Sequence, residues 1–268
     1  MFILGIILFI AGIAVVIIGA FLNNNVEVQM ESIIGTGQTN PGTIWIILGV
    51  VGAVIGAGLI IYALYLHNSG KKPLFSDSSK DNNKFTIKDY FKFSVKQLVA
   101  TAIGAAIFFL LARFLSFPVF ANTYLTLQYA IVGFFAAVFG PICGLLIGLI
   151  GHFFVDLSWG WGVWWSWVIA SAIVGFLSGF LLKPGKVEEG DLGVIDYVRF
   201  IVGSLVVHAI AWGVVAPGGD ILIYAEPADK VFTQGLIAGA GNFVITAVVG
   251  SLLLFGYSRL RPKTGSLE

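Results

Sequence analysis

The sequence predicts an all-α integral membrane protein, and three observations support this fold class. Hydrophobic residues make up 58% of the 268 residues and charged residues only 11%, with a mean hydropathy of +0.96. Soluble domains average about 45–50% apolar residues. Eight apolar runs approach the roughly 20 helical residues needed to cross about 30 Å of hydrocarbon. The basic residues gather between or after these runs.

The eight predicted spans divide into an N-terminal pair and a group of six. Residues 1–66 are predicted to form a two-helix transmembrane hairpin, residues 67–96 a cytoplasmic linker and residues 97–268 a six-helix core. The linker is rich in Lys, Asp, Ser and Asn, which is typical of a solvated segment. The first run lacks the basic start and the A-x-A site of a secretory signal, so it is expected to be retained. The spans are expected at residues 2–22, 44–66, 98–117, 125–139, 142–157, 162–182, 198–216 and 236–257.

The distribution of basic residues predicts the orientation. All but two of the 15 Lys and Arg residues fall within residues 71–96, 183–199 and 259–263. The positive-inside rule places these stretches, and with them both termini, in the cytoplasm. The two exceptions, Arg113 and Lys230, fall on the predicted outer side. Because topology and lipid headgroups account for the basic residues, no nucleic-acid partner is expected.

Small residues recur at a spacing of four along several spans, which lets helix backbones approach closely in a membrane. Glycine pairs of this kind are expected to pack helices inside the molecule. Ala102 and Ala106 have the same spacing in the first core span, where internal packing and a partner surface are both open interpretations. The glycine pairs in the core are Gly144 and Gly148, Gly175 and Gly179, and Gly235 and Gly239.

Few polar residues interrupt the predicted spans, and those few are functional candidates. A charged side chain at the centre of a membrane helix costs about 2.5–3.5 kcal/mol on insertion scales. Arg113, Asp156 and Asn242 all approach the predicted outer face, where a pocket open to the exterior would collect them. Snorkelling to the headgroups is the alternative for Arg113. For His208, at the centre of its span, a hydrogen bond between helices is favoured.

His152 and Asp156 are four residues apart, so they share a helix face. Such a pair can bind a metal or act as acid and base. However, a metal site takes three or four ligands, and no H-E-x-x-H motif or second nearby histidine is present. A hydrogen-bonded pair that shapes a pocket is therefore favoured, and no metal, cofactor or catalytic residue is predicted.

Tryptophan is concentrated at a predicted outer boundary, where residues 159–167 contain five of the seven Trp residues. An interfacial belt is one interpretation. The other is an aromatic lining that stacks on a flat heterocyclic ligand. The second interpretation adds Asn122, Trp161 and Trp164 to Arg113, Asp156 and Asn242 as candidate substrate-binding residues.

Residues 217–235 form a long, acidic outer connection in the prediction. Loops longer than about 12–15 residues are often functional, so a lid over an outer site is favoured over an ordinary connector. The candidate gating residues are Asp220, Tyr224, Glu226 and Lys230.

Four segments resemble a known family: GHFFVD at residues 151–156, WWSWVIASAIVG at 164–175, AWGVVAP at 211–217 and DILIYAEPADKVFTQG at 220–235. They are similar to S components of energy-coupling factor (ECF) transporters, the integral-membrane substrate-binding subunits of bacterial importers. The resemblance is to the riboflavin-type group, in which many members have no assigned substrate. It runs from about Phe91 to the C-terminus, and the last of the four segments is the most specific.

The resemblance implies a six-helix S component in a bacterial cell membrane. Such a subunit captures a vitamin or similar micronutrient at the outer face and delivers it inward with a T subunit and two cytoplasmic ATPases. It also implies that residues 116–124 and 217–235 help to close the site, and that Ala102 and Ala106 contact the T subunit. The sequence contains no G-x-x-x-x-G-K-[ST] phosphate loop, so ATP would be hydrolysed by another chain.

Several alternatives stay open at this point. Flavin, thiamine precursors, cobalamin and haem all fit a fold that changes its pocket while keeping its helices. An intramembrane enzyme using His152 and Asp156, with His208 as a further candidate, is a competing class, and so is a structural membrane protein without a ligand. The N-terminal hairpin departs from the six-helix pattern, and its role is open.

Overall fold

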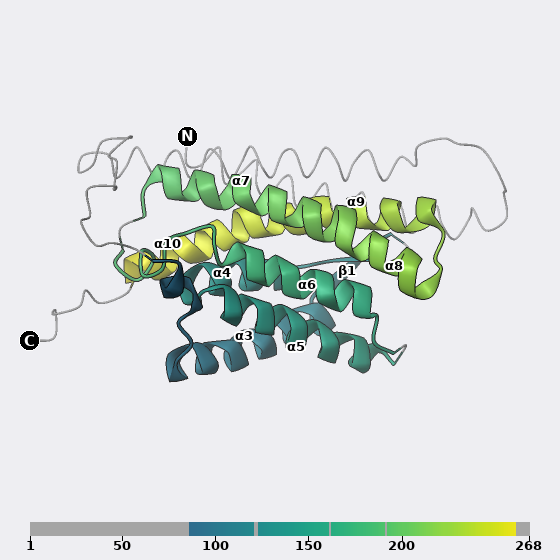
Figure 1. Cartoon of the computed structure of the whole chain (residues 1–268), viewed down its shortest axis with the longest axis horizontal. Coiled ribbons are helices and arrows are strands. Elements are labelled where there is room, and N and C mark those ends of the chain that lie inside the picture. Colours follow the sequence, from purple (N-terminus) through teal and green to yellow (C-terminus); the bar gives the residue numbers. More distant parts are fainter. Residues whose placement is uncertain (1–85, 121–122, 161, 191, 261–268) are drawn as a thin grey trace, which may run out of the picture.

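The computed structural model describes residues 86–120, 123–160, 162–190 and 192–260, which form a bundle of helices aligned along one long axis (Figure 1). The predicted N-terminal hairpin, most of the predicted linker, Asn122 and Trp161 lie outside the described residues. The hairpin and the domain boundaries therefore stay predictions.

The described elements follow the expected order of six core spans. Two of these spans are longer than expected, because α7 continues through η3 into α8 and α9 continues through η4 into α10, where η3 and η4 are π-helical. Four helical runs are long and apolar enough to cross a membrane, namely Val95–Phe114, Pro141–Trp159, Val194–Tyr224 and Ala228–Leu260, while α4 and α6 are shorter apolar helices. This confirms the all-α membrane fold class. The elements are η2 (Ile87–Phe91), α3 (Val95–Phe114), β1 (Ser116–Phe120), β2 (Thr123–Thr126), α4 (Gln128–Phe139), α5 (Pro141–Trp159), α6 (Trp165–Ser178), α7 (Val194–Ile210), η3 (Ala211–Val215), α8 (Ala216–Tyr224), α9 (Ala228–Ile245), η4 (Thr246–Gly250) and α10 (Ser251–Leu260).

The prediction of a long loop at residues 217–235 was wrong. This segment is helical except for a short connection at residues 225–227, which begins with Ala225 in the left-handed region at φ 54°. Pro217 does not end the helix because it follows η3, where regular i to i−4 bonding is already interrupted. Asp220 suggested a solvated loop, but its carboxylate is buried and hydrogen-bonded within the bundle.

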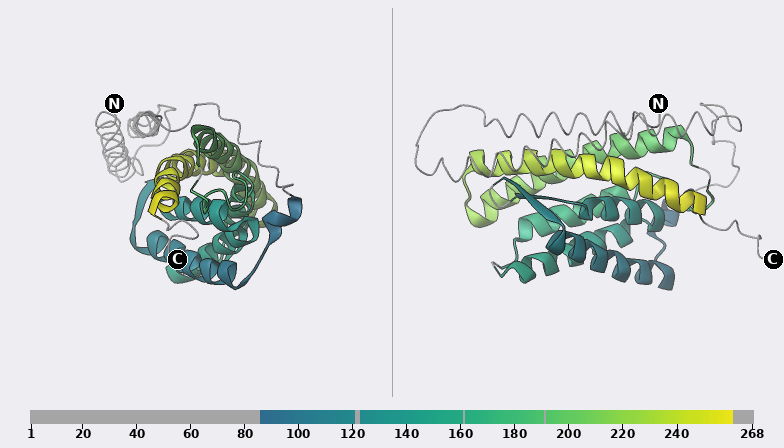
Figure 2. Two further views of the ribbon diagram at one scale, coloured as in Figure 1. Left: turned by 90° about the vertical axis from the view of Figure 1, so that its left-hand side faces the viewer. Right: turned by 180° about the vertical axis from the view of Figure 1, so that it is seen from behind.

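The other expected outer loop, residues 116–124, forms part of an antiparallel hairpin in which Ser116 lies opposite Thr126. Seen from behind, the hairpin lies between α3 and the long α9–α10 helix, and both elements contact it (Figure 2). It is a small addition to an otherwise helical bundle.

Glycine sets the approach of α5 to α6, as its spacing predicted. A Cβ atom built on Gly175 would lie 1.9 Å from the carbonyl oxygen of Gly144, and one built on Gly148 would lie 2.2 Å from that of Ser171. On the other side of the bundle, a Cβ on Gly235 would lie 2.1 Å from the carbonyl oxygen of Trp212. No side chain fits at these points, so the backbones touch and neighbouring polar groups come within hydrogen-bond range.

One face of α3 packs inside the bundle and the opposite face does not. Ala105 and Phe108 are buried, whereas Ala102 and Ala106 are exposed, flanked by exposed Ile103 and other large apolar side chains. Within the described residues, Ala102 and Ala106 therefore do not pack helices internally. The contact of these two residues with a partner stays a prediction.

The bundle has two chemically different ends. We call one the α8–α9 end, formed by the end of α5, residues 160 and 162–165, and the connection at residues 225–227. We call the other the basic end, formed by η2, residues 183–190 and the end of α10. Figure 1 shows the two ends at opposite extremes of the long axis. Arg113 lies near the end of α3, and Lys230 lies near the start of α9, both toward the α8–α9 end. The other described basic residues lie toward the basic end.

Candidate functional site

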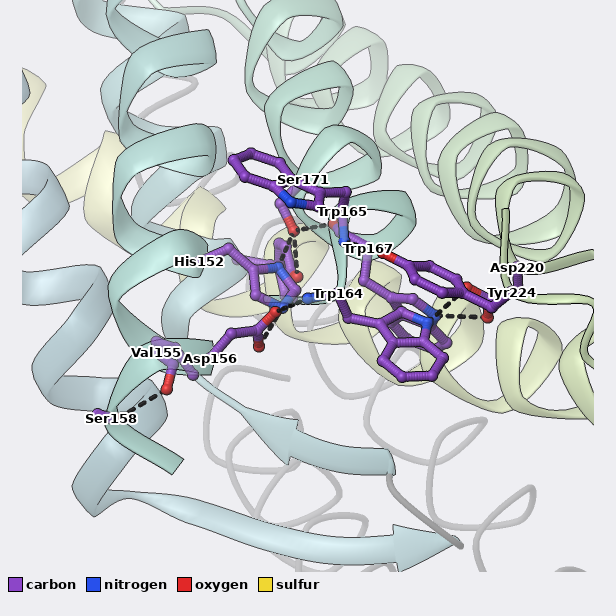
Figure 3. A network of polar contacts seen from close by, with 11 residues as sticks. His152, Val155, Asp156, Ser158, Trp164, Trp165, Trp167, Ser171, Asp220 and Tyr224 are labelled. Carbon is purple, nitrogen blue, oxygen red and sulfur yellow. Dashed lines mark hydrogen bonds and ion pairs between the residues drawn. The ribbon is translucent and has the colours of Figure 1, made fainter. Parts of the chain in front are cut away.

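A buried carboxylate, Asp220, organises the polar contacts at the α8–α9 end (Figure 3). Asp220 is 2% exposed. Its Oδ1 accepts a hydrogen bond from Nε1 of Trp164 at 2.7 Å and its Oδ2 one from Nε1 of Trp167 at 2.8 Å, while the Ser166 hydroxyl also donates to Oδ1. These donors lie at the start of α6 and are neutral. Gly219 makes the approach possible, since a Cβ there would lie 2.7 Å from Cβ of Ser166.

Tyr224 makes a second connection between α8 and the start of α6, one helical turn beyond Asp220. Its ring stacks on the Trp164 indole with a centroid distance of 4.2 Å and an interplanar angle of 26°. Its hydroxyl accepts the backbone N–H of Trp165 at 2.9 Å. Stacking and hydrogen bonding together hold the tip of α8 against α6.

Asp156 connects the end of α5 to the same region. Its Oδ2 accepts the backbone N–H of Trp164 at 2.8 Å, and its Oδ1 lies 3.5 Å from Nε2 of His152. The chain turns back between α5 and α6 because Gly160 and Gly162 take positive φ angles of 81° and 88°, which glycine adopts without steric cost. The predicted contact between His152 and Asp156 is confirmed, and two predicted site residues, Asp156 and Trp164, are hydrogen-bonded to each other.

The polar contacts continue into the interior through Ser171 on α6. Its Oγ lies 2.5 Å from Nδ1 of His152 and 2.8 Å from the hydroxyl of Tyr129 on α4, and it donates to the carbonyl of Trp167 at 3.0 Å. A connected series of side chains therefore runs from Asp156 to Tyr129 across α5, α6 and α4.

His208 bonds across the two π-helical segments. The indole N–H of Trp212, in η3, donates to Nδ1 of His208 at 3.1 Å, and Nε2 of His208 lies 2.9 Å from Oγ1 of Thr246 in η4. An indole is a donor only, so Nδ1 carries no proton and the N–H at Nε2 donates to Thr246. His208 is therefore neutral in this arrangement, and the predicted hydrogen bond between helices is confirmed.

An aromatic cluster lies beside these polar groups. The ring of Tyr129 contacts Trp212 edge to face at 5.2 Å and Phe108 at 5.7 Å, and Trp212 in turn lies 5.2 Å from Trp167. Sequence reasoning missed Tyr129, Ser171 and Trp212 as members of the region. Their N–H or O–H groups inside apolar spans were the available signal, because such groups seek partners within the protein in a membrane.

The remaining predicted residues have other partners. The Arg113 guanidinium lies over the Trp159 ring at 4.4 Å, and Trp159 stacks on Tyr124 of β2. Lys230 pairs with Glu226 at 2.6 Å on the surface of the α8–α9 end. The four candidate gating residues thus form two separate groups, Asp220 with Tyr224 and Glu226 with Lys230.

Asn242 is buried in α9, and its Oδ1 has no hydrogen-bond partner. Thr126 and Gln128 have unpartnered oxygens of the same kind near the start of α4. Within the described residues, no three His, Cys, Asp or Glu side chains come together as a metal site would require.

The family model described as "ECF-type riboflavin transporter, S component" matches residues 92–259, which is more than half of the chain. The chain belongs to this family. It is 43% identical over 176 residues to a UPF0397 protein of Lactococcus lactis subsp. cremoris (strain NZ9000), covering 65% of this chain and 97% of that relative. It is 44% identical over 178 residues to a UPF0397 protein of Streptococcus pneumoniae (strain CGSP14), covering 66% and 97%. No solved structure matches.

Family membership makes this S-component chain a substrate-binding transporter subunit and a multi-pass protein of the cell membrane. The predicted N-terminal hairpin precedes the residues that match the family model. About a third of the chain has no counterpart in these two relatives, which it covers almost completely.

Proposed function

We propose that this S component binds a vitamin or similar micronutrient at its α8–α9 end and that this end faces the exterior. The observation that supports the proposal is the pair of buried carboxylates of Asp156 and Asp220, which the half-buried Trp164 connects at the end opposite most of the described basic residues. By the positive-inside rule the basic end faces the cytoplasm, and both termini lie there. Uptake then requires a separate T subunit and two cytoplasmic ATPases.

Asp220 and Tyr224 hold α8 against α6, so we assign them to the outer gate. Their partners Trp164 and Trp165 belong to the start of α6, and opening the α8–α9 end requires these contacts to separate. Glu226 and Lys230 are surface members of the same end. Arg113 on Trp159, together with Asn122 and Trp161 from outside the described residues, completes the proposed ligand region.

The exposed face of α3 fits the T subunit. Small residues at Ala102 and Ala106 let a partner helix approach closely. Ala106→Leu is expected to leave folding and ligand binding unchanged and to abolish co-purification with the T subunit. Ala105→Leu is no suitable control because Ala105 is buried, whereas Leu110→Ala changes the same exposed face without adding bulk. Retention of the T subunit by Ala106→Leu would contradict the assignment.

Binding is favoured over catalysis by the burial of Ser171. The contacts of His152 with Ser171 and Asp156 involve the same residue types as a hydrolase triad, but Ser171 lies at Nδ1 and Asp156 at Nε2, the reverse of the triad. Moreover, Ser171 is 0% exposed, and its hydroxyl also contacts Tyr129 and the carbonyl of Trp167. A nucleophile has to reach its substrate, so this arrangement positions polar groups instead.

Ligand identification tests the proposed function directly. The full chain, purified in mild detergent, is expected to release a small molecule that mass spectrometry identifies, and to rebind it. Co-expression with the T subunit and ATPases should give uptake that depends on this chain. Absence of any bound small molecule, together with unchanged uptake when the chain is deleted, would refute the proposal. Turnover lost in His152→Ala without any ATPase present would favour an enzyme.

A further inference from the structure

A π-helical segment lies at each end of the helix pair formed by α8 and α9. η3 (Ala211–Val215) precedes α8, and η4 (Thr246–Gly250) follows α9. We call residues 216–245, which lie between them, the α8–α9 arm; its two helices pack against each other (Figure 1). A regular helix satisfies its own backbone groups in a membrane, whereas π turns are frequent at functional sites. Two π segments at the two ends of one arm therefore require a physical reason.

The backbone at η3 is less restrained than that of a regular helix. The N–H of Ala216 bonds to the carbonyl of Ala211, five residues back instead of four. The carbonyl of Trp212 would next receive the N–H of residue 217, but that residue is a proline and has none. Gly213 lies in the same segment, and no atom of another element lies within 4 Å of the point where its Cβ would be. Bending therefore costs little at this point.

The arm crosses η3 at two glycines of α9. A Cβ atom built on Gly235 would lie 2.1 Å from the carbonyl oxygen of Trp212, and one built on Gly239 would lie 3.1 Å from Cβ of Trp212. The contact of a glycine Cα–H with a carbonyl oxygen is weak. Because no large side chains interlock at Gly235, α9 can shift on η3 without repacking of the core there.

His208 connects the two π segments through hydrogen bonds. It lies one turn before η3 and is 1% exposed. Its Nδ1 accepts the indole N–H of Trp212 in η3 at 3.1 Å, and its Nε2 donates to Oγ1 of Thr246, the first residue of η4, at 2.9 Å. Trp212 and Thr246 are both 0% exposed, so water does not compete for these bonds. Bending at either segment changes the hydrogen bonds of His208.

We propose that η3 and η4 are a pair of hinges on which the α8–α9 arm moves as one body, and that His208 is a positioning residue that holds both hinges in the closed arrangement. The inference rests on the proposed function, because the arm carries the gate residues Asp220 and Tyr224. Opening bends both hinges, separates Asp220 from α6 and breaks the bond from His208 to Thr246.

A buried serine at the start of α6 reports this opening without any ligand. Ser166 is 2% exposed, and a Cβ on Gly219 of the arm would lie 2.7 Å from its Cβ. In the full chain in lipid nanodiscs, Ser166→Cys should react with a water-soluble methanethiosulfonate only when the arm moves away. The rate of reaction of this thiol therefore measures opening. The native chain, whose single cysteine is the buried Cys143, gives the background and reveals any unfolding.

Two glycines in equally open surroundings test the hinge at η3. Gly213 lies in η3 and Gly218 in α8, and alanine fits at both because the Cβ position meets no atom of another element. Alanine restrains a helical backbone more than glycine does, by a free energy that corresponds to about two- to fivefold in an equilibrium. Gly213→Ala should slow the reaction of the thiol by this factor, and Gly218→Ala should leave it unchanged. Equal effects would overturn the assignment of η3 as a hinge.

Three variants near η4 test the positioning role of His208. Thr246→Val keeps the shape of the side chain but removes the acceptor of the His208 N–H, so the thiol should react about two- to tenfold faster. Thr246→Ser restores the hydroxyl and should return the rate close to the native one. Ser251→Ala removes a buried hydroxyl without a partner directly after η4 and should leave the rate unchanged. An unchanged rate in Thr246→Val would remove His208 from the hinge.

Pairs of spin labels test whether the arm moves as one body. Leu222 on α8, Leu236 on α9 and Val202 on α7 are all exposed, so each accepts a label after substitution by cysteine. Double electron–electron resonance should give a single distance between positions 222 and 236, which both lie in the arm. The distance between positions 222 and 202 crosses η3 and should have two populations, the second of which Gly213→Ala reduces. Two populations within the arm would contradict motion as one body.

The outcomes separate this inference from the proposed function. If a small molecule co-purifies with the chain but neither Gly213→Ala nor Thr246→Val changes the reaction of the thiol, the inference fails alone. A thiol that never reacts in any variant would also overturn it, because the arm would then stay closed. If the thiol responds as expected and no small molecule co-purifies or supports uptake, the proposed function fails while the hinges stand.

Discussion

The two ends of the bundle treat buried carboxylates in opposite ways. At the basic end, Asp196 is 4% exposed and pairs with Lys186 at 2.7 Å, and it also accepts the backbone N–H of Gly193. At the α8–α9 end, Asp220 is held by indole and hydroxyl donors, and Asp156 by a backbone N–H with Nε2 of His152 3.5 Å away. A buried charge without a counter-ion is costly. We infer that the ion pair fixes the structure of the basic end, whereas the hydrogen bonds at the α8–α9 end can break and re-form when that end opens.

The largest expected effect comes from breaking the ion pair at the basic end. Lys186→Met removes the near cation of Asp196 and leaves only Arg199, whose guanidinium is 4.0 Å away on a side chain that is 58% exposed. The free energy of unfolding should fall by about 3 kcal/mol, the low end of the range for a broken buried pair. SDS-induced unfolding of the purified protein measures this loss. Ligand affinity of the folded fraction should stay unchanged, since the pair lies at the far end of the bundle.

A double variant and a surface variant sharpen this first prediction. Lys186→Met combined with Asp196→Leu should recover much of the stability, because the buried carboxylate that lost its lysine is gone. Lys92→Met removes a pair in which the lysine side chain is 74% exposed, and it should change stability by less than about 1 kcal/mol. Equal losses in Lys92→Met and Lys186→Met would show that burial does not distinguish the two pairs.

The next largest effect is expected at Asp220, whose carboxylate is held by neutral donors and not, like that of Asp196, by a cation. Asp220→Asn keeps the size of the side chain but turns an NH2 donor toward groups that themselves donate. With a buried donor left unpaired, unfolding should become easier by about 1–3 kcal/mol. Unlike Lys186→Met, this variant should also speed ligand release, which stopped-flow tryptophan fluorescence measures. Unchanged release would remove Asp220 from the gate.

The sequence predicted those features of the fold that depend on the pattern within a single helix. Hydropathy located the core spans, and glycine spacing predicted that Gly144 and Gly175 are positions of close helix packing. The contact of His152 with Asp156 followed from a spacing of four on one helix. Each of these depends on local periodicity, which the sequence carries directly.

The rest of the site depends on registers between helices that no local pattern reports. Asp220 suggested a solvated loop because its partners Trp164 and Trp167 lie more than 50 residues away in sequence. Tyr129 and Ser171 meet only when α4 and α6 are both placed. Pro217 suggested that a helix ends there. In the structure, α7 continues into α8 because Pro217 follows the π-helical η3, where regular bonding is already interrupted. The sequence therefore pointed to residues of the site but did not show which of them pair across helices.

The smallest expected effect concerns the second connection at the α8–α9 end. Tyr224→Phe keeps the stack on Trp164 and removes the hydroxyl that accepts the Trp165 N–H, so about 0.5–1.5 kcal/mol of stability should be lost. Ligand release should be faster than in the native chain and slower than in Asp220→Asn. Glu226→Gln, which disrupts a partly exposed pair with Lys230 at the same end, is the control and should release ligand at the native rate. If Glu226→Gln speeds release as much as Tyr224→Phe does, the surface pair holds the gate instead of the contacts with α6.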